Sequence, residues 1–173
     1  MKTICLFCVL CCLSCLVPVY AETAPIDEYK VKAGYLFNFT KFIAWPADNT
    51  ETFNICIVGN DPFGESINPI EQRTAFNRPI KLFRLTAINA ESHCHIVYMN
   101  ADGSVKTPGS GAKNGLTVGE NADFITQCGM IAFIKQQDKI KLQINLKLLQ
   151  QNGLKVSAKL LEVAELVEGC SHD

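Results

Sequence analysis

The sequence predicts an α/β fold with a mainly parallel sheet, helices on both faces, and a C-terminal antiparallel hairpin followed by helices. Three observations lead to this prediction. A long apolar segment of helical character comes first, short β-branched runs then alternate with short helical segments, and two adjacent strand-like runs near the C-terminus break the alternation. Strands that alternate with helices are typical of parallel sheets, whereas strands joined by a two-residue turn favour an antiparallel hairpin.

Residues 1–21 have the pattern of a secretory signal peptide. A basic start is followed by an almost unbroken apolar stretch up to Tyr20, and Ala21 precedes charged residues. The stretch is shorter than the ~20 apolar residues of a membrane span, so a leader cleaved after Ala21 is a better interpretation than a membrane anchor. A lipoprotein cut before Cys15 is a weaker alternative. We therefore expect an exported protein in which residues 22–173 form a single domain.

The segment 27–44 predicts one helix that ends before Pro46, because proline disfavours helical geometry in the residue that precedes it. A helix on a single core needs an apolar stripe of ~100°, and this one covers about twice that arc. Two explanations remain open: a deeply buried helix, or a helix that also faces a partner or a second copy. The candidate partner-binding residues are Tyr35, Phe39, Phe42 and Trp45.

The hydrophobic periodicity shortens after this helix. Apolar, β-branched runs predict strands at 53–59, 78–86, 94–100 and 115–119. Short helices are expected at 63–72 and 120–127, and a mobile surface loop rich in Gly, Ser and Lys at 101–115. Two further runs, 129–137 and 138–145, predict the hairpin, and 146–169 holds two amphipathic helical segments.

The predicted leader contains both CxxC spacings of the chain, so a thioredoxin-like redox motif has no basis in the remainder. Four cysteines remain, and in an exported protein they allow three pairings into two disulfides. They are Cys56, Cys94, Cys128 and Cys170.

His93, Cys94 and His95 resemble three metal ligands in a row. In a strand, however, side chains alternate, so the two histidines share one face and Cys94 points to the other. We therefore predict no metal site here. Cys56 lies within one predicted strand and Cys94 opens another, and such strands can be neighbours in a doubly wound sheet. A bond between them would add on the order of 3 to 4 kcal/mol, and would leave Cys128 and Cys170 as a second pair.

The sequence contains no recognisable motif of a catalytic or cofactor site. GxSxG and glycine-rich dinucleotide motifs are missing. The net charge of −1, without a basic run, does not favour a nucleic-acid partner. Loops that follow predicted strands are a common place for ligands in open α/β sheets, so a small-molecule-binding module is the alternative function. Its candidate residues are Asn60, Asp61, Phe63, Gly119 and Glu120.

Six segments together resemble the YfiR-like periplasmic proteins, in order and in spacing. They are "YKVKAGYLFNFTKFIAWP", "FNICIVGNDPFG", "RPIKL", "CHIVYM", "LTVGENADFITQCGMIAFI" and "KIKLQINLKLLQQNGLKVSAKLLEVA". The resemblance covers about residues 28–165. In one respect the chain departs from the family pattern, which has a helix between the third and fourth strands where this sequence has the 101–115 loop.

The resemblance implies a regulator and not an enzyme. YfiR-like proteins inhibit an inner-membrane diguanylate cyclase by binding its periplasmic sensor region, and a peptidoglycan-associated outer-membrane lipoprotein can release them. The output would be control of cyclic di-GMP and of biofilm formation. The resemblance also implies a homodimer without a cofactor, and a disulfide between the positions that match Cys56 and Cys94. A further hypothesis is that reduction of the disulfides relieves the inhibition.

Overall fold

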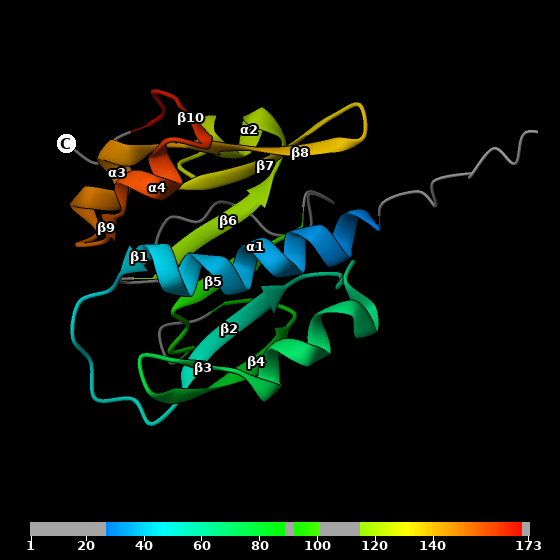
Figure 1. The fold of residues 1–173 in the computed structure, drawn as a ribbon, viewed down its shortest axis with the longest axis vertical. Helices are drawn as coiled ribbons and strands as arrows, with labels where there is room; N and C mark the ends of the chain where they lie inside the picture. The colour runs from blue at the N-terminus through cyan, green and yellow to red at the C-terminus, as the bar shows by residue number, and fades with distance from the viewer. Residues whose placement is uncertain (1–26, 89–91, 101–114, 171–173) are drawn as a thin grey trace, which may run out of the picture.

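The computed structural model describes residues 27–88, 92–100 and 115–170 (Figure 1). The predicted signal peptide, residues 1–21, and nearly all of the predicted 101–115 loop lie outside these residues.

An eight-stranded sheet forms the centre of the molecule, in the order β10-β8-β7-β6-β5-β2-β4-β3. Its strands are β2 (Phe53–Val58), β3 (Thr74–Ala75), β4 (Arg78–Leu85), β5 (Ile96–Met99), β6 (Leu116–Glu120), β7 (Ile131–Gln136), β8 (Lys139–Ile144) and β10 (Ala164–Leu166). The five strands β4, β2, β5, β6 and β7 are mutually parallel. The predicted hairpin is confirmed, because β8 runs antiparallel to β7 with Gln136 opposite Lys139.

The first helix, α1 (Glu28–Phe42), is two residues shorter at its C-terminal end than the sequence predicted. Asp27 caps its start by accepting a hydrogen bond from the Lys30 backbone N–H at 3.1 Å. Ile43 and Ala44 leave the helix as β1 (Ile43–Ala44), which pairs antiparallel with β9 (Lys155–Val156). This pairing satisfies the backbone hydrogen-bonding groups of Ile43 and Ala44 in an extended conformation. The helix therefore ends at Phe42 and not at Ala44.

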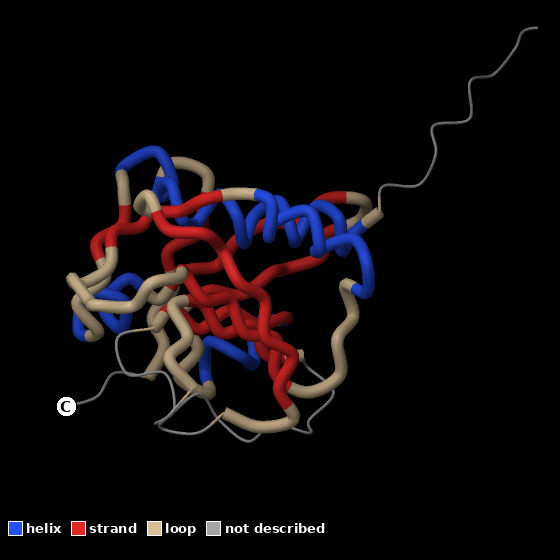
Figure 2. Tube along the Cα trace, turned by 90° about the horizontal axis from the view of Figure 1, so that it is seen from below, coloured by secondary structure: helices blue, strands red, loops and turns tan. Residues whose placement is uncertain are grey.

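The other helices are short. They are η1 (Gly64–Gln72), a 3₁₀ helix, and α2 (Asn121–Thr126), α3 (Leu146–Gln151) and α4 (Ala158–Leu161). The prediction of helical structure up to residue 169 was wrong beyond α4, because residues 164–166 pair with β8 and form β10. Figure 2 shows most of the helical segments on one side of the sheet and a shorter one on the opposite side.

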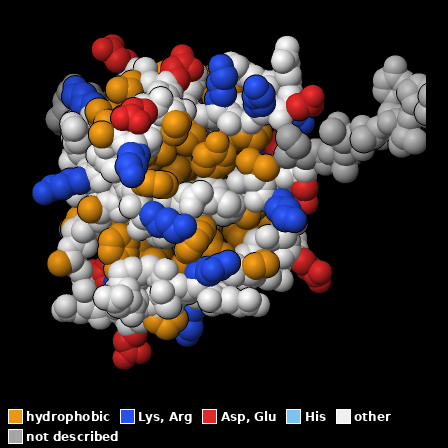
Figure 3. All heavy atoms as spheres, viewed as in Figure 1, with side chains coloured by type: hydrophobic (Ala, Val, Ile, Leu, Met, Phe, Trp, Pro, Cys, Tyr) orange, Lys and Arg blue, Asp and Glu red, His pale blue; other side chains and the backbone are white. Residues whose placement is uncertain are grey.

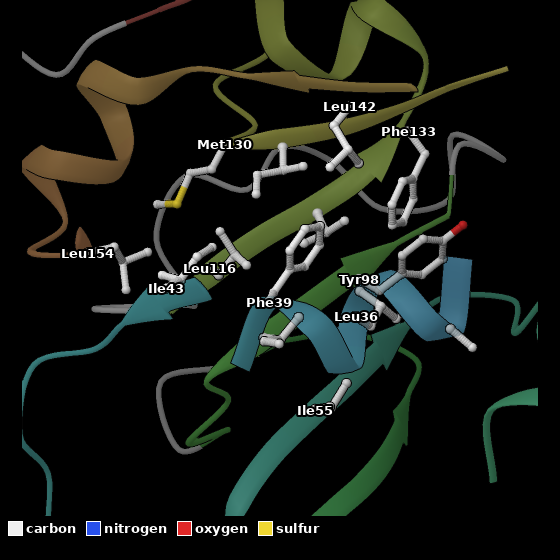
Figure 4. Close-up of a cluster of buried hydrophobic side chains, with 14 of the residues drawn as sticks. Leu36, Phe39, Ile43, Ile55, Tyr98, Leu116, Met130, Phe133, Leu142 and Leu154 are labelled. Carbon is white, nitrogen blue, oxygen red and sulfur yellow. The ribbon is translucent and has the colours of Figure 1, made fainter. Parts of the chain in front are cut away.

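Alternating residues of the strands divide the interior into two cores. The larger core lies under α1, where Leu36 and Phe39 pack over Tyr98, Leu116 and Phe133 (Figure 4). The smaller core lies on the opposite face of the sheet. It consists of Cys56, Val58, Cys94, Val97 and Met99, with Leu85, Ile88 and Phe124 packed against it.

Phe124 of α2 covers part of the smaller core between two glycines. A Cβ atom at Gly119 or at Gly129 would overlap the Phe124 ring. The sequence suggested Gly119 as a ligand-loop residue, but here its missing side chain makes room for an aromatic ring that closes this face of the sheet.

Candidate functional site

The candidate partner-binding residues of α1 do not all lie at the surface. Phe39 is fully buried in the larger core, so its side chain cannot contact a partner in this structure. Tyr35, Phe42 and Trp45 are each half-buried and pack against that core from its edge. Tyr35 stacks on Phe39, and its ring centroid lies 5.8 Å from that of Phe133. Because Tyr35 is only half-buried, part of its side chain stays accessible.

The exposed side of α1 is a narrow polar ridge between apolar flanks. Lys30, Gly34 and Lys41 are exposed on the ridge. Figure 3 shows apolar side chains gathered in two bands, one on each side of α1. Tyr35, Phe37 and Phe42 are among the half-buried residues of this helix. We call the ridge and its two flanks the α1 surface.

The sequence left two explanations open for α1: a deeply buried helix, or a helix that also faces a partner or a second copy. Each describes part of the helix. One stripe is buried in the core, and the flanks stay partly accessible. An apolar patch of this kind, rimmed by charged residues, is typical of a protein–protein contact.

A charge cluster built around the buried Lys32 holds the first turns of α1 against the carboxyl ends of the strands. The Nζ atom of Lys32, whose side chain is only 2% exposed, lies 2.5 Å from Glu28 Oε1 and 2.8 Å from Glu120 Oε1. Tyr98 donates a hydrogen bond from its hydroxyl to the same Glu120 oxygen. Lys135 of β7 completes the cluster with its Nζ 2.7 Å from Glu28 Oε2.

The pKa values of this cluster follow its contacts. Hydrogen bonds from Lys135 and Lys32 lower the pKa of Glu28. Burial, together with the hydrogen bond to Glu120, raises the pKa of Tyr98, so its hydroxyl stays protonated and remains a donor. All these groups are paired within the protein, and the cluster therefore has a structural role.

Lys32 was not identified by the sequence analysis. The signal available was the spacing of four residues from Glu28 to Lys32, which puts opposite charges on one face of a helix. Its contact with Glu120, 88 positions away, depends on the tertiary structure.

The candidate ligand-loop residues have internal contacts. Phe63 is buried against Tyr29 and Tyr98, and Glu120 belongs to the charge cluster. Asp61 accepts hydrogen bonds from the Phe63 backbone N–H at 2.8 Å and from Arg84 Nε at 2.7 Å. Of the five candidate residues only Asn60 is exposed, so these loops offer a ligand little accessible polar surface. Ligand binding at these loops stays a prediction.

A second polar cluster surrounds His95 near the start of β2. The backbone N–H of Asn54 donates to His95 Nδ1 at 2.9 Å, so this nitrogen is the acceptor and the ring proton lies on Nε2. Nε2 lies 2.8 Å from Asp48 Oδ2, to which it donates. Arg78 binds the other oxygen of Asp48 at 2.5 Å. The cluster joins the segment before β5, the start of β4, β2 and the loop before β2, and it occupies both nitrogens of the imidazole.

The geometry keeps His95 neutral and Asp48 ionised. Burial lowers the pKa of His95 below its ordinary 6.5, and this outweighs the opposing effect of Asp48. For Asp48, burial raises the pKa, but hydrogen bonds from Thr50, His95 and Arg78 outweigh it and lower the value. Protonation of His95 would also remove the acceptor for the Asn54 N–H.

We expect the stability of the protein to fall as the pH drops from about 7 toward about 5. In this window the unfolded chain binds a proton at His95 before the folded chain does, so stability rises with pH. The change His95→Gln removes this titratable group. It should therefore flatten the dependence of the free energy of unfolding on pH, measured by urea unfolding at several pH values. His93→Gln, at an exposed neighbouring position, is the matched control. An equal change of slope in both variants would contradict the assignment.

The described residues contain two disulfides. Cys56 of β2 bonds to Cys94, just before β5, with their Cα atoms 5.9 Å apart. Cys128, after α2, bonds to Cys170 near the C-terminus, with a Cα–Cα distance of 5.1 Å. The first bond lies in the smaller core, and the second is half-buried. Both are the pairs that the sequence analysis put forward.

Among the described residues, no group of three or more His, Cys, Asp or Glu side chains is placed to hold a metal ion. His93 and Cys94 do not converge with His95, because the cysteine is in the disulfide and the ring of His95 lies against Phe53 at 4.4 Å.

Comparison with known proteins shows the family of the chain. A family model described as YfiR/HmsC-like matches residues 29–165, from the first turn of α1 into β10. The chain belongs to the YfiR/HmsC-like family. A search of curated proteins gives no match.

Membership in the YfiR/HmsC-like family indicates a periplasmic regulatory protein, and the two disulfides fit an oxidising compartment. Within the described parts of this YfiR/HmsC-like chain, none of the helices has the length and apolar character needed to cross a bilayer. The matched range includes the α1 surface, the cluster around His95, and Cys56, Cys94 and Cys128. It also includes the charge cluster except for Glu28, and it ends before Cys170.

Proposed function

We propose that this protein inhibits an inner-membrane diguanylate cyclase by binding the cyclase's periplasmic sensor region through the α1 surface. The observation that carries the proposal is the pair of half-buried apolar flanks beside the ridge of α1. Family membership supports regulation of a cyclase. The protein would then act by binding and not by catalysis, with control of cyclic di-GMP and of biofilm formation as its output.

Inhibition by binding requires a preference for one state of the cyclase. To move an equilibrium from 99:1 active to 99:1 inactive, the inhibitor must bind the inactive state about 10⁴-fold more tightly. Burial of apolar area contributes to such a preference only if the active state cannot form the same contact. Tyr35 and Phe42 are side chains that such a contact would bury further.

The exported mature form would begin after Ala21 and act as a single domain and a homodimer. A peptidoglycan-associated outer-membrane lipoprotein would compete for it and release the cyclase. Reduction of the disulfides would loosen the domain and weaken inhibition. The homodimer and the lipoprotein follow from the family resemblance, cleavage after Ala21 follows from the signal-peptide pattern, and the effect of reduction is a separate hypothesis.

Gly34 offers a clean test of the α1 surface. It is exposed, and a Cβ atom at this position would meet nothing within 4 Å. We expect Gly34→Ala to inhibit as the wild type does and to raise the free energy of unfolding by about 0.5–1 kcal/mol. Gly34→Glu should fold equally well but weaken inhibition by about tenfold or more, because binding would bury a carboxylate.

The measurement is cyclic di-GMP synthesis by membranes that contain the cyclase, titrated with each variant. If Gly34→Glu inhibits as well as Gly34→Ala, the contact is not at the α1 surface. If the wild-type protein neither changes synthesis nor copurifies with the cyclase, the proposed function itself is wrong.

A further inference from the structure

On the sheet face opposite α1, the structure contains a cavity of about 440 Å³. β2 and β4, which are neighbours in the sheet (Figure 1), form its floor. Phe83 and Leu85 of β4 line one side, and the Cys56–Cys94 disulfide lines the other. His93 and Asn54 lie at the polar edge.

We propose that this cavity is a binding site for a small, uncharged aromatic molecule, which covers the Cys56–Cys94 disulfide when it binds. The volume is in the range of ligand pockets, which are lined mainly by apolar groups with a few polar ones. Among the described residues, none that lines the cavity is Asp, Glu, Lys or Arg, so this part of the lining supplies no fixed counter-charge for a charged ligand.

The apolar lining suits an aromatic ring in particular. Phe83 remains 39% exposed although it is a large apolar residue, so part of its ring is free for contact. Aromatic rings pack favourably in offset or edge-to-face geometry, and sulfur atoms make favourable contacts with ring edges. A flat ligand between Phe83 and the disulfide would gain both contacts.

The polar edge of the cavity is already ordered without a ligand. Asn54 donates from its side-chain Nδ2 to the His93 carbonyl at 2.7 Å and accepts from Thr52 at 2.6 Å. The disulfide ties the neighbouring Cys94 to β2. A preformed site loses little conformational entropy on binding, and the exposed imidazole of His93 supplies a hydrogen-bonding group at the rim.

This site goes beyond the proposed function. It lies on the opposite face from the α1 surface, and it shares no residue with the loops around Asn60 and Glu120. A ligand there would also shield the disulfide of the smaller core from reductants.

The first test uses N-phenyl-1-naphthylamine, a neutral aromatic probe whose fluorescence rises in apolar surroundings. With the oxidised protein we expect saturable binding at one site. Phe83→Ala should weaken it by about tenfold or more, whereas Phe76→Ala should not change it. Phe76 is the matched control, because it is also an exposed phenylalanine and lies outside the cavity. Unfolding curves of both variants verify that they fold.

The second test needs no variant. Wild-type protein is treated with a phosphine reductant with and without saturating probe, and the freed thiols are alkylated and quantified by mass spectrometry. We expect severalfold slower reduction of Cys56–Cys94 and an unchanged rate for Cys128–Cys170, which serves as the internal control. No saturable binding, equal affinity in Phe83→Ala, or equal slowing of both disulfides would each overturn the proposal.

Discussion

Replacement of Cys56 and Cys94 by alanine together is expected to lower the free energy of unfolding by about 4 kcal/mol. The bond spans 38 positions in the sequence, and the chain-entropy estimate for a loop of this length gives about that value. Both cysteines are also buried in the smaller core, so the variant loses packing as well as the cross-link. Urea unfolding of the oxidised proteins measures the effect.

The matched control is the double replacement of Cys128 and Cys170. Their bond spans a similar 42 positions, and chain entropy alone therefore predicts a similar loss. We expect the Cys56 and Cys94 variant to lose more, because both of these cysteines are buried, whereas Cys128 and Cys170 are half-buried. Equal losses would mean that packing around the first disulfide contributes little.

The change Lys32→Met is expected to destabilise the protein by roughly 3 kcal/mol. It leaves Glu28 and Glu120 close together without their shared cation, and loss of one partner from a buried ion pair is costly. The two carboxylates are 23% and 19% exposed, which lets water offset part of the cost. The value comes from urea unfolding at neutral pH.

Lys30→Met is the control for Lys32→Met, since Lys30 lies on the same helix with an exposed side chain. We expect it to change stability by less than about 0.5 kcal/mol. Similar losses of unfolding free energy in the two variants would show that any lysine of this helix contributes equally, and that the contacts of Lys32 with Glu28 and Glu120 add no stability.

The two faces of the sheet have different chemistry. The face under α1 carries a large core and leaves apolar flanks at the surface, which suits a macromolecular partner. The opposite face carries a small core, a disulfide and a cavity, which suits a small molecule. Partner binding and ligand binding can therefore be separated by variants on one face at a time.

Most strand positions were predictable because short apolar runs between turn residues allow few other structures. The runs at 53–59 and 78–86 agree with β2 and β4 to within one residue, and the turn at Gln137 separates β7 from β8. The C-terminal segment was less predictable. Residues 164–166 have an amphipathic helical pattern, but their backbone pairs with β8.

The candidate site was only partly predictable from the sequence. The helical pattern of α1 identified Tyr35, Phe42 and Trp45 but also Phe39, which is buried, because periodicity gives the direction of a side chain and not what covers it. The cavity at Phe83 was missed altogether. Its walls come from β2, β4 and the segment before β5, and they meet only through the register of the sheet.

The sequence by itself determined the α/β class, the positions of the main strands along the chain, the hairpin and the family, because these depend on local periodicity and on motifs in a fixed order. The tertiary structure confirmed the two cysteine pairs. It alone decided which side of α1 is buried, which carboxylates pair with Lys32, and which groups hydrogen-bond to His95. The physical reason is distance along the chain. Contacts between residues some 40 to 90 positions apart depend on strand order and register, which no local pattern specifies.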